Sequence, residues 1–250
     1  MRLAARRLPV PGAFLLFAGC MAIIGCGNAR GRPGPGPEVV RPDEVLAFSV
    51  LYQQNCSACH GANGKNGPAI SLANPVYLAV AGEDNLRQTI AKGVPGKLMP
   101  PFARSSGGML TDRQITALAQ GLLSQWGTTD VLAGQNPPSY AATLQGDAER
   151  GQQAFGVSCA RCHGAMGEGS QGDRNSNSGR IGSIVDPSYL ALISDQNLRS
   201  ITIAGRPDIG MPDWRSDAAQ PLTDQQITDI ITWLASKRTT DPGQPYRSRP

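Results

Sequence analysis

The chain has 250 residues, of which 40% are hydrophobic, 5% aromatic and 17% charged, and its formal net charge is +4. This length suggests one or two domains. Arg2, Arg6 and Arg7 supply most of that charge from the first 25 residues, which contain no acidic residue, and no basic block with interleaved aromatic residues follows. The composition therefore excludes nucleic acid as a partner.

The N-terminal segment, residues 1–25, has a basic start and an apolar stretch that is too short and too interrupted by proline for a membrane span. It is typical of an export signal. Its end, "IIGC", resembles the lipobox of bacterial lipoproteins, which predicts lipidation of Cys26, with Cys20 as the weaker choice. An ordinary signal peptide or an uncleaved anchor is the alternative. Residues 26–42 are rich in glycine and proline and predict an extended tether, so the expected location is the periplasmic side of a bacterial membrane, with the lipid as anchor.

Two copies of one plan follow, at residues 43–128 and 147–238, with a linker at 129–146 and a tail at 239–250 that has no apolar periodicity and is predicted to be disordered. In each copy, an amphipathic segment comes first. A terminal segment opens with a Thr-x-x-Gln capping box and has one apolar face. No stretch shows sustained strand-type alternation. The predicted fold class is all-α.

The two copies do not have the same length. Met99 and Met211 are 112 positions apart, whereas His60 and His163 are 103 apart. Nine extra residues must therefore lie in the second copy after His163, in a stretch rich in glycine, serine and asparagine. We interpret that stretch as a solvated insertion.

The same short motif, Cys-x-x-Cys-His, occurs once in each copy: Cys56, Cys59 and His60, then Cys159, Cys162 and His163. A zinc site would need further ligands nearby, and the chain has no third histidine. A thioredoxin-like thiol pair would need a sheet around it. The spacing instead favours covalent attachment of haem, in which both thiols bind one porphyrin edge and the adjacent histidine binds the iron. The sequence therefore predicts two covalently bound haem c groups with iron.

The second axial ligand of each iron follows by elimination, because both histidines are already used. Met99 and Met211 occupy the same repeat position, and each precedes a proline. They are predicted to bind the two irons. The alternative is that both fill gaps in the core, and Met109 is then the fallback ligand in the first copy.

With these ligands, each half resembles a class I c-type cytochrome domain, and the chain resembles a dihaem cytochrome c. The resemblance implies a small helical fold whose first helix crosses the last beside the haem, through a Gly-x-x-x-aromatic pattern. The second copy keeps that pattern as Gly151 and Phe155. The first copy has Phe48 and Tyr52 instead, which predicts a wider crossing there.

The resemblance also implies a proline whose carbonyl accepts the proton of the histidine's other ring nitrogen. Pro68 fits this role in the first copy, whereas the second copy has Gly179 and Arg180 at the corresponding place. Loop geometry alone is the other role open to Pro68. Four further residues are candidates for binding the haem propionates, with solvated helix positions or packing as the alternative: Arg87, Arg199, Tyr77 and Tyr189.

A His/Met-ligated iron has no vacant position for a substrate and exchanges single electrons. We therefore expect an exported, membrane-tethered electron-transfer protein with no catalytic residues and no small-molecule substrate. It would pass electrons between respiratory or photosynthetic complexes, either as a carrier or as a subunit docked in a larger membrane complex. The alternative is a haem enzyme, such as a dihaem peroxidase or a sulfur-compound dehydrogenase.

Overall fold

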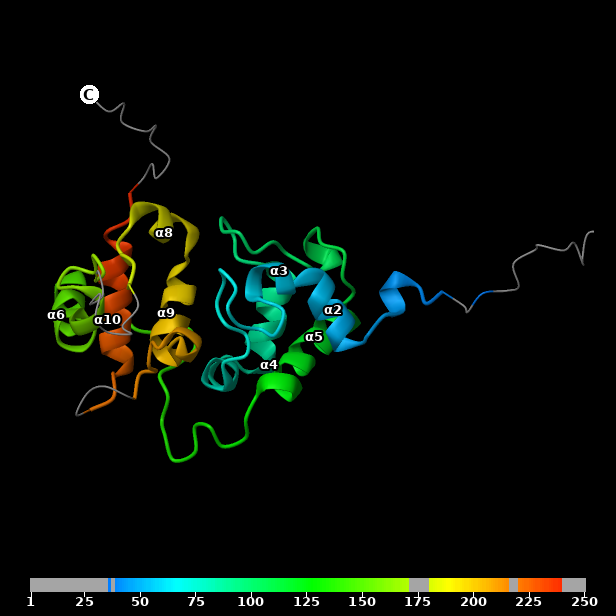
Figure 1. Ribbon diagram of the computed structural model, residues 1–250, viewed down its shortest axis with the longest axis horizontal. Helices are drawn as coiled ribbons and strands as arrows, with labels where there is room; N and C mark the ends of the chain where they lie inside the picture. The colour runs from blue at the N-terminus through cyan, green and yellow to red at the C-terminus, as the bar shows by residue number, and fades with distance from the viewer. Residues whose placement is uncertain (1–35, 37–38, 171–179, 216–219, 240–250) are drawn as a thin grey trace, which may run out of the picture. The chain divides into compact units, whose positions relative to one another are not determined.

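The computed structural model describes residue 36 and residues 39–170, 180–215 and 220–239 (Figure 1). Residues from Pro42 onward form one compact unit that contains both copies, and the residues up to Arg41 form a separate unit. The export signal, Cys26, most of the tether and nearly all of the tail lie outside the described residues. Among the described helices, none combines the length and the apolar character that a membrane span requires.

The first copy contains three longer helices and three short helical turns among the described residues. In chain order its elements are η2 (Pro42–Glu44), α2 (Phe48–Asn55), α3 (Ser57–His60), α4 (Pro75–Lys92), η3 (Arg104–Ser106) and α5 (Asp112–Trp126). Both α2 and α4 pack against α5 (Figure 1). The terminal helix therefore forms the centre of this copy.

The second copy repeats the arrangement. Its elements are α6 (Ala148–Ser158), α7 (Ala160–His163), α8 (Pro187–Leu192), α9 (Asp195–Ala204), η4 (Pro207–Ile209) and α10 (Asp224–Ala235). Both α6 and α9 pack against α10. The described residues form only isolated β-bridges and no strand, which confirms the all-α prediction.

The helix ends lie where the sequence chemistry predicts them. Thr111 and Gln114 form the expected capping box at the start of α5, and Thr223 and Gln226 form the one at the start of α10. These contacts satisfy backbone N–H groups that have no partner within the helix.

The middle helix differs between the copies. Within α4, Gly82 has a φ of +68°, so the helix is broken there. The matching position is Ser194, whose side chain accepts a hydrogen bond from the Asn197 N–H and starts α9 as a separate helix. Gly82 breaks the helix through its left-handed backbone, whereas Ser194 starts a separate helix by capping it.

At the helix crossing of each copy, a glycine on one helix faces a large residue on the other. The two copies place that glycine on opposite helices. In the second copy, a Cβ added to Gly151 of α6 would lie 2.0 Å from the Asp229 carbonyl oxygen of α10 and 2.9 Å from the Trp233 Cβ. In the first copy the repeat positions of Gly151 and Trp233 are held by Phe48 and Gly121, and a Cβ on Gly121 would lie 2.1 Å from the Phe48 ring. The first copy thus makes its close approach with the glycine on the other helix.

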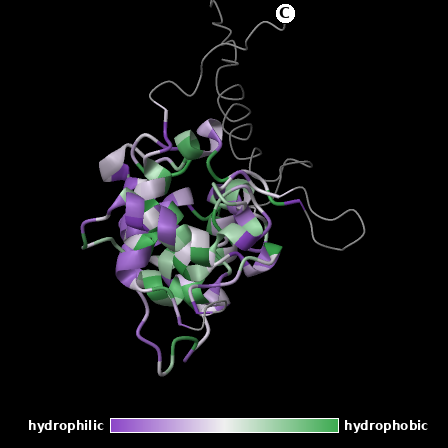
Figure 2. Ribbon diagram, turned by 90° about the vertical axis from the view of Figure 1, so that its left-hand side faces the viewer, coloured by the Kyte–Doolittle hydropathy of each residue, from purple (hydrophilic) through white to green (hydrophobic). Residues whose placement is uncertain are grey.

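Aromatic side chains complete both crossings. Phe155 and Trp233 are 1% and 2% exposed, with ring centroids 4.6 Å apart. In the first copy, Tyr52 and Trp126 meet edge to face at 5.0 Å. The helices carry hydrophobic residues on one side and hydrophilic residues on the other (Figure 2).

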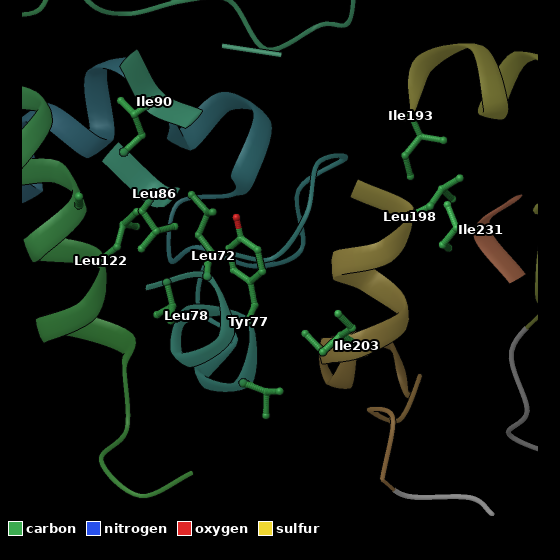
Figure 3. Close-up of a cluster of buried hydrophobic side chains, with 14 of the residues drawn as sticks. Leu72, Tyr77, Leu78, Leu86, Ile90, Leu122, Ile193, Leu198, Ile203 and Ile231 are labelled. Carbon is green, nitrogen blue, oxygen red and sulfur yellow. The ribbon is translucent and has the colours of Figure 1, made fainter. Parts of the chain in front are cut away.

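Figure 3 shows the buried side chains that α4 and α9 contribute to the core, among them Leu78 and Leu86 of α4 and Leu198 and Ile203 of α9. The two copies are not independent of one another, because α4 also packs against α9.

Candidate functional site

The first Cys-x-x-Cys-His motif occupies one helical turn. Cys56 ends α2 and precedes α3, and its carbonyl oxygen accepts the His60 N–H at 3.0 Å. Both cysteines are free thiols: Cys56 is half-buried and Cys59 is exposed, while His60 is 8% exposed. Two free sulfurs and one buried imidazole therefore lie within a single turn.

The second motif has the same backbone. Cys159 has φ −122° and ψ −30°, against −121° and −35° for Cys56. The His163 N–H donates to the Cys159 carbonyl at 3.0 Å, and Cys159 and Cys162 are also free thiols. The same set of donor groups is thus built twice.

The chemistry of these thiols does not support a redox-active pair. Burial, together with the neighbouring thiol in each motif, raises the pKa of both Cys56 and Cys159 to about 11. A reactive thiol needs a lowered pKa. Nor do the described residues contain a cluster of three or more acidic, cysteine or histidine side chains suited to a metal ion, as a zinc site would.

His60 is oriented by a backbone carbonyl, but not by the predicted one. Its Nδ1 lies 2.8 Å from the Ile70 carbonyl oxygen. The acceptor role predicted for the Pro68 carbonyl is therefore wrong, because the loop folds back at Ala69, whose N–H donates to the Cys59 carbonyl at 3.0 Å. That fold brings the following carbonyl to the imidazole. Burial lowers the pKa of His60, and the hydrogen bond to Ile70 opposes that shift.

His163 has no matching acceptor among the described residues. Its Nδ1 is buried and without a hydrogen-bond partner there, and burial lowers the pKa of the ring. Gly179 and most of the enlarged loop lie outside the described residues, and Arg180 is exposed. Among the described residues, only His60 has the contact that would tune a bound iron.

The two Met-Pro segments are held by the same turn. The Met99 carbonyl accepts the Val94 N–H at 3.0 Å, and the Met211 carbonyl accepts the Arg206 N–H at 2.8 Å. Each turn lies against a glycine of positive φ, Gly93 at +64° and Gly205 at +66°. A Cβ on either glycine would lie within 2.7 Å of the methionine carbonyl oxygen, so only glycine leaves room for the turn.

Burial also distinguishes Met99 from Met109, the alternative ligand of the first copy. Met99 is half-buried and packs against the hydrophobic core, whereas Met109 is 81% exposed. Met99 is therefore the better-placed ligand candidate in the first copy.

Of the two methionine turns, the second carries an ion pair between described residues, and the first carries none there. Arg206 donates to Asp208 through Nε at 2.9 Å and through Nη2 at 2.8 Å. The Arg206 guanidinium holds the pKa of Asp208 below its usual range. The first copy has Val94 and Gly96 at these two positions. A charged pair next to Met211, with uncharged residues at the two matching positions of the first copy, would give the two sites different electrostatics.

Of the two arginines predicted to bind propionates, Arg199 is engaged elsewhere. It is 2% exposed, and its guanidinium donates to the Ser139 carbonyl, to Thr228 Oγ1 and to the Asp224 carboxylate. A guanidinium has five N–H donors, so three acceptors leave two of them, and the propionate role of Arg199 stays a prediction. Arg87 is exposed and lies 3.6 Å from Asp84 on the same helix, and its propionate role stays a prediction.

Tyr77 and Tyr189 occupy matched positions with different neighbours. Tyr77 is 6% exposed, and burial raises its pKa, with Tyr140 of the linker adding to the shift. Burial also raises the pKa of Tyr189, against the opposing charge of Arg206. Their contact with propionates stays a prediction.

Taken together, the residues present fit two covalently attached haems. Each copy offers two free sulfurs, an adjacent imidazole and a methionine turn supported by a glycine.

Sequence reasoning missed the Ile70 acceptor, the Arg206–Asp208 pair and the buried Asn74. The repeat alignment carried a signal for the pair, since a charged residue replaces Val94 in the second copy.

Two family models match the chain, one in each copy. The model described as "Cytochrome C oxidase, cbb3-type, subunit III" matches residues 44–120, and the model "Cytochrome c" matches residues 148–237.

Similar curated proteins include the cbb3-type cytochrome c oxidase subunit CcoP of Rubrivivax gelatinosus, 32% identical over 55% of this chain and 40% of that protein. The thiosulfate dehydrogenase of Psychrobacter arcticus is 29% identical over 76% of this chain and 57% of its own length. The chain thus spans about half the length of these relatives. Among solved structures, the Kuenenia stuttgartiensis reducing HAO-like protein complex Kustc0457/Kustc0458 covers 81% of this chain at 18% identity, and its TM-score of 0.44 is too low to carry an argument.

Proposed function

The chain is a tandem of two cytochrome c-type domains, which imply two covalently bound haem c groups, and we propose that it transfers single electrons through two His/Met-ligated irons. The observation that carries this proposal is the matched pair of Met-Pro turns, each supported by a glycine on which a Cβ would collide with the turn. A bound haem supplies reversible one-electron exchange.

The residues of the chain would hold and orient each group. Cys56 and Cys59 would bind it through thioethers in the first copy, and His60 and Met99 would be the protein ligands of the iron. The Ile70 carbonyl holds the His60 imidazole at 2.8 Å in one orientation. With both ligands supplied by the protein, no position would be left for a substrate.

The partners belong to the proposal as well. Two sites on one chain form a relay between an electron donor and an electron acceptor, and redox proteins or a larger membrane complex supply both. The similarity to cbb3-type oxidase subunits supports the larger membrane complex. Export and lipidation at Cys26 would hold the protein at the periplasmic face of the membrane, and loss of palmitate labelling in Cys26→Ser would test that part.

The test of ligation is an optical spectrum of the haem-loaded protein, oxidised and reduced. The weak long-wavelength band of iron–methionine coordination should be present in wild type. It should shrink in Met99→Ala and in Met211→Ala, whereas Met109→Ala, which alters an exposed methionine, should leave it unchanged. A five-coordinate, high-spin haem in wild type would contradict the proposal.

A second candidate function is supported by the thiosulfate dehydrogenase relative, which matches 76% of this chain. In that case, thiosulfate would reduce the purified haem protein directly. Reduction by thiosulfate in stopped-flow mixing, together with an open iron in the spectrum, would favour the enzyme. Slow or absent reduction with two closed irons would favour the carrier.

A further inference from the structure

Asn74 joins the two copies. It is the N-cap of α4, and its Oδ1 accepts the N–H groups of Val76 and Tyr77 at 3.0 and 3.2 Å. Its Nδ2 donates to the carbonyl oxygens of Ala204 and Gly205 at 2.9 and 3.2 Å, across to the end of α9. The residue is 2% exposed, and both its amide oxygen and its amide nitrogen are fully used.

These hydrogen bonds of Asn74 form a bridge between two loops that carry predicted haem ligands. On the first-copy side, Asn74 ends the loop that starts at His60, and Ala73 donates its N–H to the Gly64 carbonyl at 2.9 Å within that loop. On the second-copy side, Gly205 lies directly beneath the Met211 turn, where a Cβ would stand 2.6 Å from the Met211 carbonyl oxygen.

Two further contacts join the same two copies, and a third joins the first copy to the linker. The Asn66 N–H in the histidine loop of the first copy interacts with the Asp208 carboxylate in the methionine turn of the second. Lys97, in the methionine turn of the first copy, donates to the Ala191 carbonyl at 2.6 Å. Tyr77 lies beside Tyr140 of the linker. The bridge is therefore one part of a fixed surface between the two copies.

The repeat supplies an internal comparison. The residue that matches Asn74 is Asp186, which caps α8 by accepting the Tyr189 N–H at 3.0 Å and is exposed. An ionised aspartate has no donor. The capping role is thus shared by both copies, whereas the donation to another loop belongs to Asn74 alone.

From these contacts we propose that Asn74 is a positioning residue that fixes the Met211 turn against the His60 loop, so that methionine ligation and reduction potential at the second iron depend on the first copy. This inference rests on the proposed function, because it concerns ligation at the second haem. A turn held by neighbouring backbone keeps its methionine sulfur at one place, whereas a released turn samples others and binds iron for a smaller fraction of the time.

The decisive variant is Asn74→Asp. Aspartate caps a helix as well as asparagine does, but it would replace two donated hydrogen bonds by a carboxylate that faces two carbonyl oxygens. The readouts are the methionine–iron band and the potential of each haem in a spectroelectrochemical titration, assigned with Met99→Ala and Met211→Ala. We expect loss of the part of the band that Met211→Ala also removes and a shift of the second potential only.

Two controls complete the experiment. Asn74→Ser keeps a capping oxygen without a charge and should show the same selective loss, which separates the missing donors from charge repulsion. Asp186→Asn, at the matched cap, should leave both potentials unchanged. Wild-type bands and potentials in both Asn74 variants would overturn the inference alone, whereas a wild-type protein without a Met211-dependent band would overturn the proposed function and the inference with it.

Discussion

Two glycines at matched positions set the path of the methionine turns. Gly93 and Gly205 both have positive φ, and both lie against the carbonyl oxygen of the methionine that follows. Positive φ alone would cost a non-glycine residue about 1–2 kcal/mol. Contact with the turn adds a steric cost that no rotamer relieves, since Cβ is fixed by the backbone.

The first prediction separates those two costs in the second copy. Gly205→Ala should destabilise the protein and remove the Met211-dependent band, because the new methyl group displaces the turn. Gly210→Ala is the control: its φ is +85°, but no atom lies within 4 Å of the added Cβ. It should lower the free energy of unfolding by about 1–2 kcal/mol and keep the band. Equal bands in both variants would contradict the role of Gly205.

At the scale of helices, close approach at a crossing requires a glycine on one partner, and either partner can supply it. The second copy uses Gly151 of α6, and the first uses Gly121 of α5. The large residue moves to the opposite helix in each case, so the pair keeps a similar total volume, which cores tolerate best.

The second prediction concerns this crossing. Gly151→Ala should lower the free energy of unfolding by about 1–3 kcal/mol, because the methyl group would overlap the Asp229 carbonyl. Gly156→Ala in the same helix meets nothing within 4 Å and should raise stability by about 0.5–1 kcal/mol, since alanine favours a helix over glycine. Urea denaturation followed by circular dichroism measures both, and similar effects of the two changes would argue against a tight crossing.

The α6–α10 contact also contains a buried carboxylate. Asp229 is 4% exposed at its side chain and accepts hydrogen bonds from Arg150, the Asp147 N–H and Gln225. Burial opposes its charge, but these donors hold the pKa of Asp229 below its usual value of 3.8. A group with a depressed folded-state pKa stabilises the fold above the unfolded value and loses that effect as the pH falls through the folded value.

The third prediction follows from the lowered pKa of Asp229. The second copy should lose stability as the pH falls below 3.8, and Asp229→Asn should weaken this pH dependence while costing about 1–3 kcal/mol at neutral pH. Thermal unfolding at stepped pH values measures it. Asp84→Asn, at a side chain that is 88% exposed, is the control and should retain the wild-type pH profile. An unchanged profile in Asp229→Asn would refute the assignment.

At the scale of the whole molecule, the linker is bound to the second copy by buried polar contacts. Arg199 holds the Ser139 carbonyl while also contacting Thr228 and Asp224 of the last helix region, and Arg215 donates to the Val131 carbonyl at 3.0 Å. The linker is thus held in place rather than free between the copies.

The fourth prediction tests this anchorage. Arg199→Gln should lower the free energy of unfolding by about 1–3 kcal/mol, because it removes the buried guanidinium that donates to Ser139, Thr228 and Asp224. The double variant with Asp224→Asn should be less destabilised than the sum of the two single variants, as expected for residues in one network. Arg87→Gln, at an exposed position, should be neutral. Additive effects of Arg199→Gln and Asp224→Asn would show that the pair is not coupled.

Patterns of residues close in sequence were sufficient to predict much of this molecule. The Cys-x-x-Cys-His spacing, the matched Met-Pro positions and the capping boxes at Thr111 and Thr223 depend on residues close in sequence. They predicted the helices, the duplication and the cytochrome c-type domains, which the structure and the family models confirm. The predicted ligands Met99 and Met211 occupy equivalent turns, and their binding to iron stays a prediction.

The tertiary structure decided what depends on distant contacts. Neither the Ile70 acceptor, nor the burial of Arg199 against the linker, nor the bridge from Asn74 to Gly205 has a local pattern, because each joins groups that the chain separates by 10 to 131 positions. A carbonyl is present at every residue, so sequence cannot say which one faces an imidazole. Folding selects it by where the loop turns back, and the same folding brings two separate ligand loops into contact.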